Sequence, residues 1–433
     1  MKNIKYTKLD FSAFIILFFI ISSDIFFNVY QYPTIRLSQL IIIYLLISYS
    51  FQNLTNKLIF SNEIYLLFIF CLLNLLFVPN SGFIYKGIGY SGWLLLNVFL
   101  VIYIIQIFNI LNYISIFKLY LYSILFVSIF GLVQFIAGCL GYGDNFGIVM
   151  WWVPGVLPRI NGFSYEPSFL ASYLICGWVV FAYLIEKSLY LYPKNTQISF
   201  FLVVTSVLIL SGSRIALIMM CIWMLRLFVI ILYKIIFLKK ITIKILLFFI
   251  LSFLTLAILY FIFKSFDDNI KLTLLNGTGL MDTPNHSISE RFSGFYKILS
   301  LIIESPLVGY SLGGLSYQLG IANGDLINNF ESSKLEGNGV LLEIFAATGI
   351  FGFSIFILFL YKIYSKFSSI KSCSNLDHKL RHMFLAFSYG FFFQFIAIQP
   401  NQNILRPYLW LNLGIFLGLY MCCSYSLRES SDD

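Results

Sequence analysis

Charged residues are scarce in this chain: Asp, Glu, Lys and Arg make up 11% of its 433 residues, whereas 60% are hydrophobic. Average soluble proteins carry about a quarter charged residues. A soluble globular protein needs more polar residues than this to cover its surface, so that class is excluded. A disordered chain is also excluded, because its composition is much less apolar. Long apolar runs and a mean hydropathy of +0.88 instead predict a polytopic membrane protein.

Motifs for metal and nucleotide binding are also missing. The seven cysteines form no CxxC pair, the three histidines form no HExxH pattern, and the glycine-rich stretch 305–314 lacks the GKS or GKT ending of a P-loop. We therefore expect no metal, no disulfide framework and no cofactor. The cysteines lie mostly in apolar runs, where buried free thiols are the usual state.

Twelve segments approach the roughly 20 apolar residues that a membrane-spanning helix needs. They are 11–30, 35–51, 59–78, 91–111, 116–139, 168–186, 198–212, 214–233, 241–263, 339–362, 379–398 and 405–425. No small-residue cleavage site follows the first segment, so we expect a membrane helix there and not a cleavable signal. Gly212–Arg214 separates the seventh and eighth segments and predicts a tight turn or a broken helix there. No internal repeat is visible, which argues against an inverted-repeat transporter.

Lys and Arg divide unequally between the two sides of the predicted membrane domain. With an even number of spans both termini lie on one side, and 18 of the 28 Lys and Arg fall there. The positive-inside rule then places both termini in the cytoplasm. The net charge of +9 thus reflects topology, and we expect no nucleic-acid partner. We expect residues 1–433 to form a single integral membrane domain, with 264–338 as a large outer loop.

Arginine is over-represented on the outer side. Five of the ten outer cations are arginines, whereas 15 of the 18 inner cations are lysines. The outer arginines are Arg36, Arg159, Arg214, Arg291 and Arg406. Arginine binds phosphate groups through two parallel hydrogen bonds, so this excess favours an anionic ligand. The alternative is that each arginine snorkels to lipid head groups.

Two outer segments combine arginine with helix-start signals. The run from Arg159 to Ser168 reads RxNGxxxEPS, in which Glu166 and a following proline open a helix. A helix cap alone does not require Arg159 or Asn161, so we expect an interfacial site. Ser211 to Arg214 reads SGSR and starts an apolar helix, which is typical of an anion site; the alternative is an interface anchor.

Three further outer segments carry polar residues. The first pairs His286 and Arg291 with SPLVGYSLGG at 305–314. The second reads NGxLLE from Asn338 and continues into ATGIFGF at 347–353, whose glycines are typical of close helix packing. The third holds Arg406 and Tyr408 in the last outer loop. All five segments lie on one predicted face, which favours one shared site.

The order of these motifs resembles the O-antigen polymerase/ligase superfamily, over roughly residues 150–415. The resemblance implies an all-α GT-C-like membrane glycosyltransferase of the bacterial inner membrane, with about 12 spans. It implies undecaprenyl-pyrophosphate-linked glycans as donor and acceptor on the periplasmic face. Ligases of this superfamily carry a histidine where this chain has Asn338, and RxNGxxxEPS is more similar to polymerases. The resemblance therefore favours a polymerase of O-antigen or capsule repeat units.

The reaction that this resemblance implies assigns a role to each motif residue. Arg159, Arg214 and Arg291 would stabilise the charge on the departing pyrophosphate without a metal. Glu166 would act as a general base or orient sugar hydroxyls, because neighbouring arginines weaken a carboxylate as a base. Substrate-binding roles are expected for Asn161, His286, Asn338, Arg406 and Tyr408. A chain-length regulator is an expected partner.

Two alternative functions remain open from the sequence. An O-antigen ligase would use the same chemistry, although Asn338 argues against it. A lipid-linked glycan flippase would carry polar residues along a central cavity, whereas mid-span charges are nearly absent here.

Overall fold

The computed structural model describes residues 7–30, 35–52, 61–153, 155–238, 287–322, 339–373, 376–400 and 404–432. These ranges are mostly helical, with two short antiparallel hairpins. The α-helices are α1 (Lys8–Ile20), α2 (Leu37–Gln52), α3 (Asn62–Leu76), α4 (Ile84–Ile107), α5 (Tyr113–Cys139), α6 (Pro167–Glu186), α7 (Lys194–Leu210), α8 (Arg214–Leu238), α11 (Ser287–Glu304), α12 (Leu315–Ala322), α14 (Val340–Ser372), α15 (His378–Ile398) and α16 (Pro407–Asp432). Short 3-10 helices are η1 (Val78–Ser81) and η2 (Asp144–Phe146).

Each hairpin pairs two short strands. Strand β1 (Asn28–Tyr30) pairs with β2 (Ile35–Arg36), and β3 (Met150–Val153) pairs with β4 (Leu157–Arg159). In the second hairpin Met150 lies opposite Arg159, so the arginine stands at the strand end that leads into the RxNG segment.

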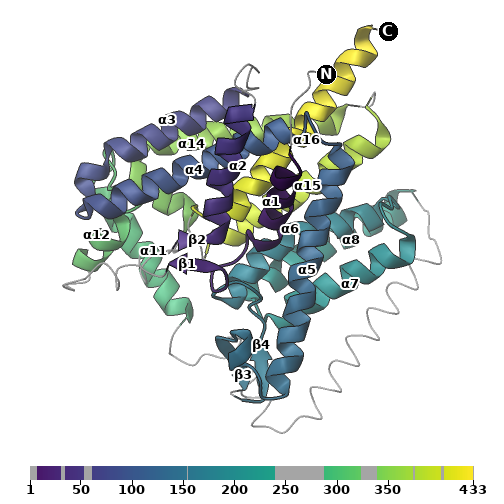
Figure 1. The fold of residues 1–433 in the computed structure, drawn as a ribbon, viewed down its shortest axis with the longest axis horizontal. Coiled ribbons are helices and arrows are strands. Elements are labelled where there is room, and N and C mark those ends of the chain that lie inside the picture. The colour runs from purple at the N-terminus through teal and green to yellow at the C-terminus, as the bar shows by residue number, and fades with distance from the viewer. Residues whose placement is uncertain are drawn as a thin grey trace.

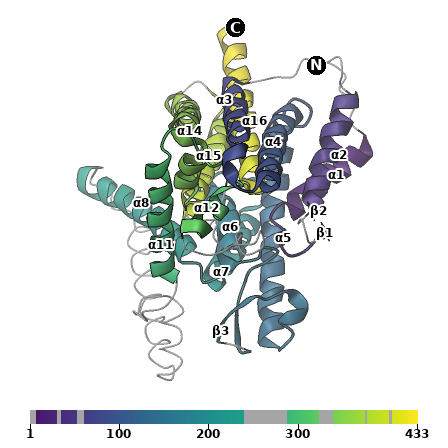
Figure 2. The same ribbon diagram turned by 90° about the vertical axis from the view of Figure 1, so that its left-hand side faces the viewer.

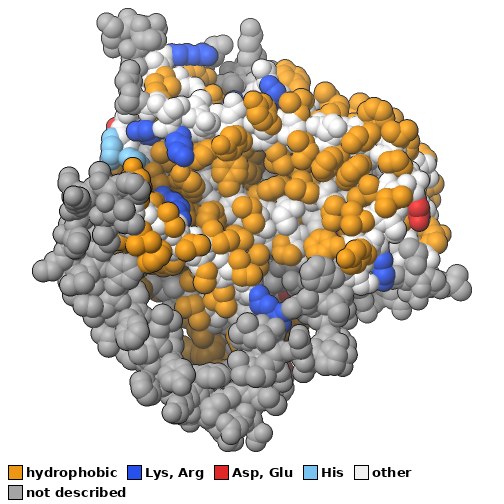
Figure 3. All heavy atoms as spheres, turned by 180° about the vertical axis from the view of Figure 1, so that it is seen from behind, with side chains coloured by type: hydrophobic (Ala, Val, Ile, Leu, Met, Phe, Trp, Pro, Cys, Tyr) orange, Lys and Arg blue, Asp and Glu red, His pale blue; other side chains and the backbone are white. Residues whose placement is uncertain are grey.

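Within the described ranges, six helices are long and apolar enough to cross a membrane: α4, α5, α6, α8, α14 and α16. Helices α2, α3 and α7 are apolar but shorter. Large hydrophobic side chains are exposed along these helices, and Figure 3 shows a broad hydrophobic face. A soluble monomer does not expose apolar surface on this scale. The chain is therefore a membrane-embedded helical protein. The predicted ninth span, 241–263, lies outside the described residues.

The first helix is shorter than the sequence predicts. The apolar run suggested a span over 11–30, but α1 ends at Ile20. Thirteen helical residues extend about 20 Å, less than the roughly 30 Å hydrocarbon core. The chain leaves the helix at a polar stretch, Ser22 to Asp24, and continues into β1.

Helix α6 lies at the centre of the bundle. It packs most extensively on α15, while α4 packs on α16 and α3 on α14. Trp178 of α6 is fully buried, as are most neighbours on all sides of that helix. Buried amides join the central helices: Asn412 donates to Gln394 at 2.7 Å, and Gln394 donates to the Ser172 carbonyl at 3.1 Å. Such hydrogen bonds hold apolar helices together in lipid.

The start of α1 and the end of α16 lie at one end of the molecule, and the β3–β4 hairpin lies at the other (Figures 1 and 2). Polar contacts also join distant helices: Lys366 pairs with Glu63 at 3.4 Å, and the Tyr183 hydroxyl lies 3.0 Å from His382.

Helix α14 is broken at Gly349, where φ is +58° and ψ is −170°. The backbone of the SPLVGYS segment forms hydrogen bonds with α14 at this break. Tyr310 and Ser311 N–H groups donate to the Ala346 and Ala347 carbonyls at 3.0 and 2.8 Å, and the Ile350 N–H donates to the Pro306 carbonyl at 2.9 Å. Two motifs that are distant in the sequence, SPLVGYS and ATGIF, thus form one unit. Gly349 allows α14 to contact this loop. The sequence had instead favoured close packing against another helix as the reason for this glycine.

Gly309 is required for this junction, because a Cβ there would overlap the Ala347 backbone. We predict that Gly309→Ala lowers the free energy of unfolding by at least about 3 kcal/mol, since backbone atoms on both sides must shift. Thermal melting of the purified protein in detergent measures the loss. In the control variant Gly89→Ala the Cβ meets open space, so stability should stay the same or rise slightly. Equal melting temperatures for both variants would contradict this account.

Candidate functional site

Buried amides fix the RxNG segment against α5. The Oε1 atom of Gln134 accepts the N–H groups of Asn161 and Gly162 at 3.1 and 2.9 Å. The Nδ2 atom of Asn161 donates to the carbonyls of Gly147 and Ser164 at 3.0 and 2.8 Å. Gly162 has φ +56°, a conformation that glycine adopts easily. The segment is therefore a rigid turn between β4 and α6.

Arg159 crosses from this turn to the junction between α7 and α8. Its Nε and Nη2 atoms donate to the Ser211 and Gly212 carbonyls at 3.3 and 3.2 Å. These carbonyls lie at the C-terminal end of α7, where the helix dipole attracts a cation. The Trp152 ring lies 5.9 Å from the guanidinium and covers Gly212. The RxNG and SGSR motifs thus meet in space, as expected of one site.

Glu166 and Arg214 lie within electrostatic range of Arg159. Burial lowers the pKa of Arg159, the positive charge of Arg214 lowers it further, and the negative charge of Glu166 raises it. Arg214 begins α8 directly after the predicted turn, in which Gly212 has φ +59°. Glu166 is the N-cap residue of α6 and accepts the Ser168 hydroxyl at 2.9 Å. Two cations and one carboxylate therefore gather beside the α6 N-terminus.

A second group of charges lies on the other side of the same turn. Asp24 Oδ1 pairs with Arg36 at 2.9 Å and with Arg406 at 2.7 Å. The Asp24 N–H donates to the Phe163 carbonyl at 2.9 Å, which ties this group to the turn. The Arg406 guanidinium also lies 4.2 Å above the Phe169 ring in the first turn of α6.

Burial and the charge of Asp24 act in opposite directions on the pKa of Arg36. Burial lowers its pKa, Asp24 raises it, and Arg406 lowers it. Two arginines share one carboxylate, so the group keeps a net positive charge. We call Arg36, Arg159, Arg214 and Arg406, with Asp24 and Glu166, the arginine site.

The arginine site carries four guanidinium groups against two carboxylates in a partly buried setting. Excess positive charge at such a place favours anionic ligands, and guanidinium groups match phosphate oxygens in geometry. The site therefore suits a phosphate or pyrophosphate. In the described part of the chain, His, Cys, Asp and Glu side chains form no group of three or more that could hold a metal ion.

The other predicted site residues are buried beside these charges, belong to other elements or lie outside the described residues, and Tyr408 is close enough to Arg36 to act on its charge. Tyr408 is 2% exposed and its ring packs 5.5 Å from that of Tyr173, so it lies inside the bundle. Asn161 is also fully buried and its amide orders the turn. Arg291 belongs to α11, which packs against α14, and His286 and Asn338 lie outside the described residues. Substrate-binding roles for these residues stay predictions.

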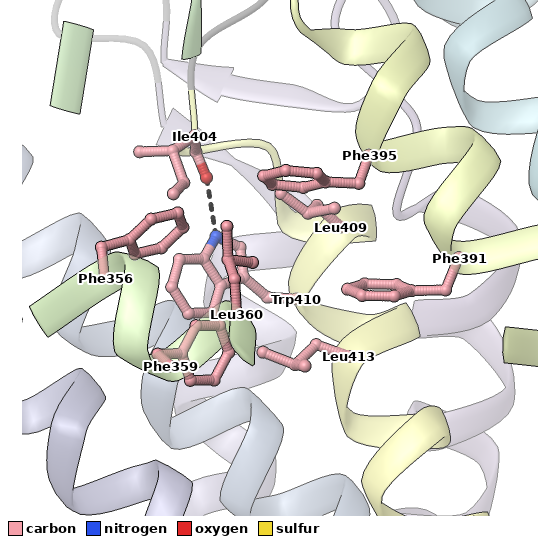
Figure 4. A pocket seen from close by; sticks show the side chains of 9 residues that line it. All are labelled: Phe356, Phe359, Leu360, Phe391, Phe395, Ile404, Leu409, Trp410 and Leu413. Carbon is pink, nitrogen blue, oxygen red and sulfur yellow. Dashed lines mark hydrogen bonds between the residues drawn. The ribbon is translucent and has the colours of Figure 1, made fainter. Parts of the chain in front are cut away.

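An apolar pocket lies between α14, α15 and α16 (Figure 4). It is a small hollow, and every lining side chain is hydrophobic. Trp410 lies in this pocket and donates to the Ile404 carbonyl at 2.7 Å. Ile404 is two residues from Arg406, so the pocket is close along the chain to the arginine site.

Sequence reasoning missed Asp24 and Gln134. Asp24 was placed inside the first predicted span, yet an acidic residue within an apolar run is itself a signal of function or pairing. Gln134 gave no such signal, because its partners are backbone groups some 27 residues away. Arg36 was recognised only as an outer cation.

In comparisons with known proteins, no family model matches the chain, and no curated protein matches it.

Gln134 tests whether the turn depends on buried hydrogen bonds. We predict that Gln134→Met lowers the free energy of unfolding by about 2–4 kcal/mol, because two buried N–H groups lose their acceptor. Thermal melting in detergent measures it. The matched variant Gln318→Met removes one exposed bond of 3.5 Å and should change stability little. A similar small change in both variants would show that the turn is held by other contacts.

Proposed function

We propose that this protein is a metal-independent membrane glycosyltransferase that polymerises lipid-linked oligosaccharide repeat units, in the manner of an O-antigen polymerase. The observation that supports it most is the arginine site, in which RxNG, EPS and SGSR residues gather with excess positive charge. The donor and acceptor would be undecaprenyl-pyrophosphate-linked glycans. The growing glycan would pass to a sugar hydroxyl of the new unit.

The chemistry requires charge stabilisation and a proton acceptor. As the bond between the donor sugar and its phosphate oxygen breaks, negative charge develops on the departing pyrophosphate. Arg159 and Arg214 lie where they would bind that charge, and Arg291 is assigned the same role from its motif. The acceptor hydroxyl forms the new glycosidic bond and loses its proton. Glu166, which acts electrostatically on Arg159, would accept this proton or orient the sugar hydroxyls.

The membrane domain suits lipid-linked substrates. The proposal includes a GT-C-like arrangement with about 12 spans, both termini in the cytoplasm and the arginine site on the periplasmic side of the bacterial inner membrane. Opposite placement of the α16 end and the β3–β4 hairpin supports it. A chain-length regulator would act as a partner.

Surface polysaccharide from a deletion strain tests the function directly. We predict that core lipid carries a single repeat unit without the gene and that the ladder of long chains returns on complementation. Bare core with accumulating lipid-linked polymer would instead indicate a ligase. Accumulation of single units facing the cytoplasm would indicate a flippase. Complementation with Arg214→Ala or Arg291→Ala should fail at normal membrane levels, whereas Lys239→Ala should succeed.

A substitution at Glu166 distinguishes a role of this carboxylate in the reaction from a role in holding the structure. We predict that Glu166→Gln keeps the folded protein, since a glutamine can still accept the Ser168 hydroxyl, but lowers polymerisation at least about 100-fold, which is typical of a lost acid or base. Chain length on gels and single-turnover transfer in membranes measure it. Glu304→Gln, an exposed acid at the end of α11, should leave activity unchanged. Normal activity of Glu166→Gln would remove Glu166 from the mechanism.

A further inference from the structure

A group of three cations and two histidines lies at the end of the bundle opposite the arginine site. It comprises Lys187 after α6, Arg226 on α8, and His378, Arg381 and His382 on the first turns of α15. We call these five residues the basic cluster, and we propose that it binds the phosphate of an anionic phospholipid in the leaflet at this end. The inference concerns lipid recognition and is independent of the proposed transferase activity.

Contacts between three helices hold the basic cluster together. The His382 Nδ1 atom lies 3.0 Å from the Tyr183 hydroxyl of α6, and the His378 ring lies 4.3 Å from the His382 ring. The charges of Lys187 and Arg381 both act on the His382 ring. Lys187 and His378 are exposed, so a head group reaches them from outside.

The acidic groups nearby leave positive charge uncompensated. Glu186 is shared by Arg226 at 2.8 Å and Lys187 at 3.2 Å. Arg381 donates to the Lys371 backbone carbonyl at 2.7 Å, which is a neutral partner. Asp377 caps α15 by accepting the Leu380 N–H at 2.9 Å. Lys187, Arg226 and Arg381 thus stand against Glu186 and Asp377, which leaves one positive charge in excess among these residues. A phosphate monoanion would therefore lower the electrostatic energy of the cluster.

Exposed aliphatic side chains continue from the cluster along α8. The Arg226 guanidinium lies 4.4 Å above the Trp223 ring and 5.5 Å from the Tyr389 ring. Trp223 is fully buried, so these rings hold the arginine from inside the bundle. Along α8, exposed Ile222 and Leu225 face outward, and α8 is the least buried of the six long apolar helices. A head group at the cluster would place its acyl chains on this surface.

Figure 3 shows histidine and Lys or Arg side chains side by side at the edge of the broad hydrophobic face. Basic pockets between membrane helices at the cytoplasmic level bind anionic lipid head groups. A free phosphate would satisfy the cations equally but would leave the apolar surface unused. Continuity between the cations and the exposed apolar surface of α8 is what favours a lipid over a soluble anion.

Reconstitution tests the proposal with phosphatidylglycerol as the probe. The full-length protein is placed in nanodiscs of phosphatidylcholine alone or with added phosphatidylglycerol, and its melting temperature is measured. We expect phosphatidylglycerol to raise the melting temperature by several degrees. Lys187→Gln combined with Arg381→Gln should remove most of that rise. Native mass spectrometry should show retained phosphatidylglycerol on the unaltered protein and little on the double variant.

Controls separate lipid binding from folding and from soluble anions. Lys194→Gln removes an exposed lysine at the start of α7 and should keep the full rise. Lys187→Arg should also keep the full rise in melting temperature, whereas Lys187→Gln alone should reduce it. If the double variant folds poorly in phosphatidylcholine, these two single variants test the proposal in its place. An equal rise in all variants overturns the proposal. Excess inorganic phosphate that produces the same rise in phosphatidylcholine nanodiscs assigns the cluster to a soluble anion and overturns the lipid assignment.

Discussion

Uncompensated guanidinium charge beside one backbone turn is the constraint that organises the candidate site. Moving a charge out of water is unfavourable unless other groups solvate it, so each arginine needs a partner nearby. Arg159 uses the carbonyls at the end of α7, and Arg36 and Arg406 share Asp24. These partners belong to segments far apart in the sequence. The pairing therefore brings β2, β4, α6 and the start of α16 together, and it leaves net positive charge for a ligand.

Rigid loops support this charge. Gln134 anchors the RxNG turn to α5, and the break at Gly349 anchors the segment around Gly309 to α14. In both places backbone groups outside regular helices find buried acceptors or donors, as a membrane-embedded protein requires. A ligand site built from such loops is held in place before substrate arrives, which reduces the reorganisation that a charged transition state demands.

Opposite ends of the bundle carry cations of different kinds. The arginine site lies beside a turn fixed by hydrogen bonds. The basic cluster instead borders the exposed side of α8. The two proposals therefore assign different ligands, a pyrophosphate that must be held and released at the first and a head group whose chains stay in the bilayer at the second.

Composition and hydrophobic run length determined by themselves that this is a helical membrane protein, because apolar helices of sufficient length satisfy their backbone hydrogen bonds internally. Local patterns also determined the turn before Arg214 and the start of α6, since glycine and proline act within a few residues. Tertiary structure alone decided that Asp24 pairs with Arg36 and Arg406, that α1 ends at Ile20, and that Gly349 receives a loop. Those outcomes depend on which distant groups become neighbours when the helices pack, and a linear pattern of residue types does not contain that distance information.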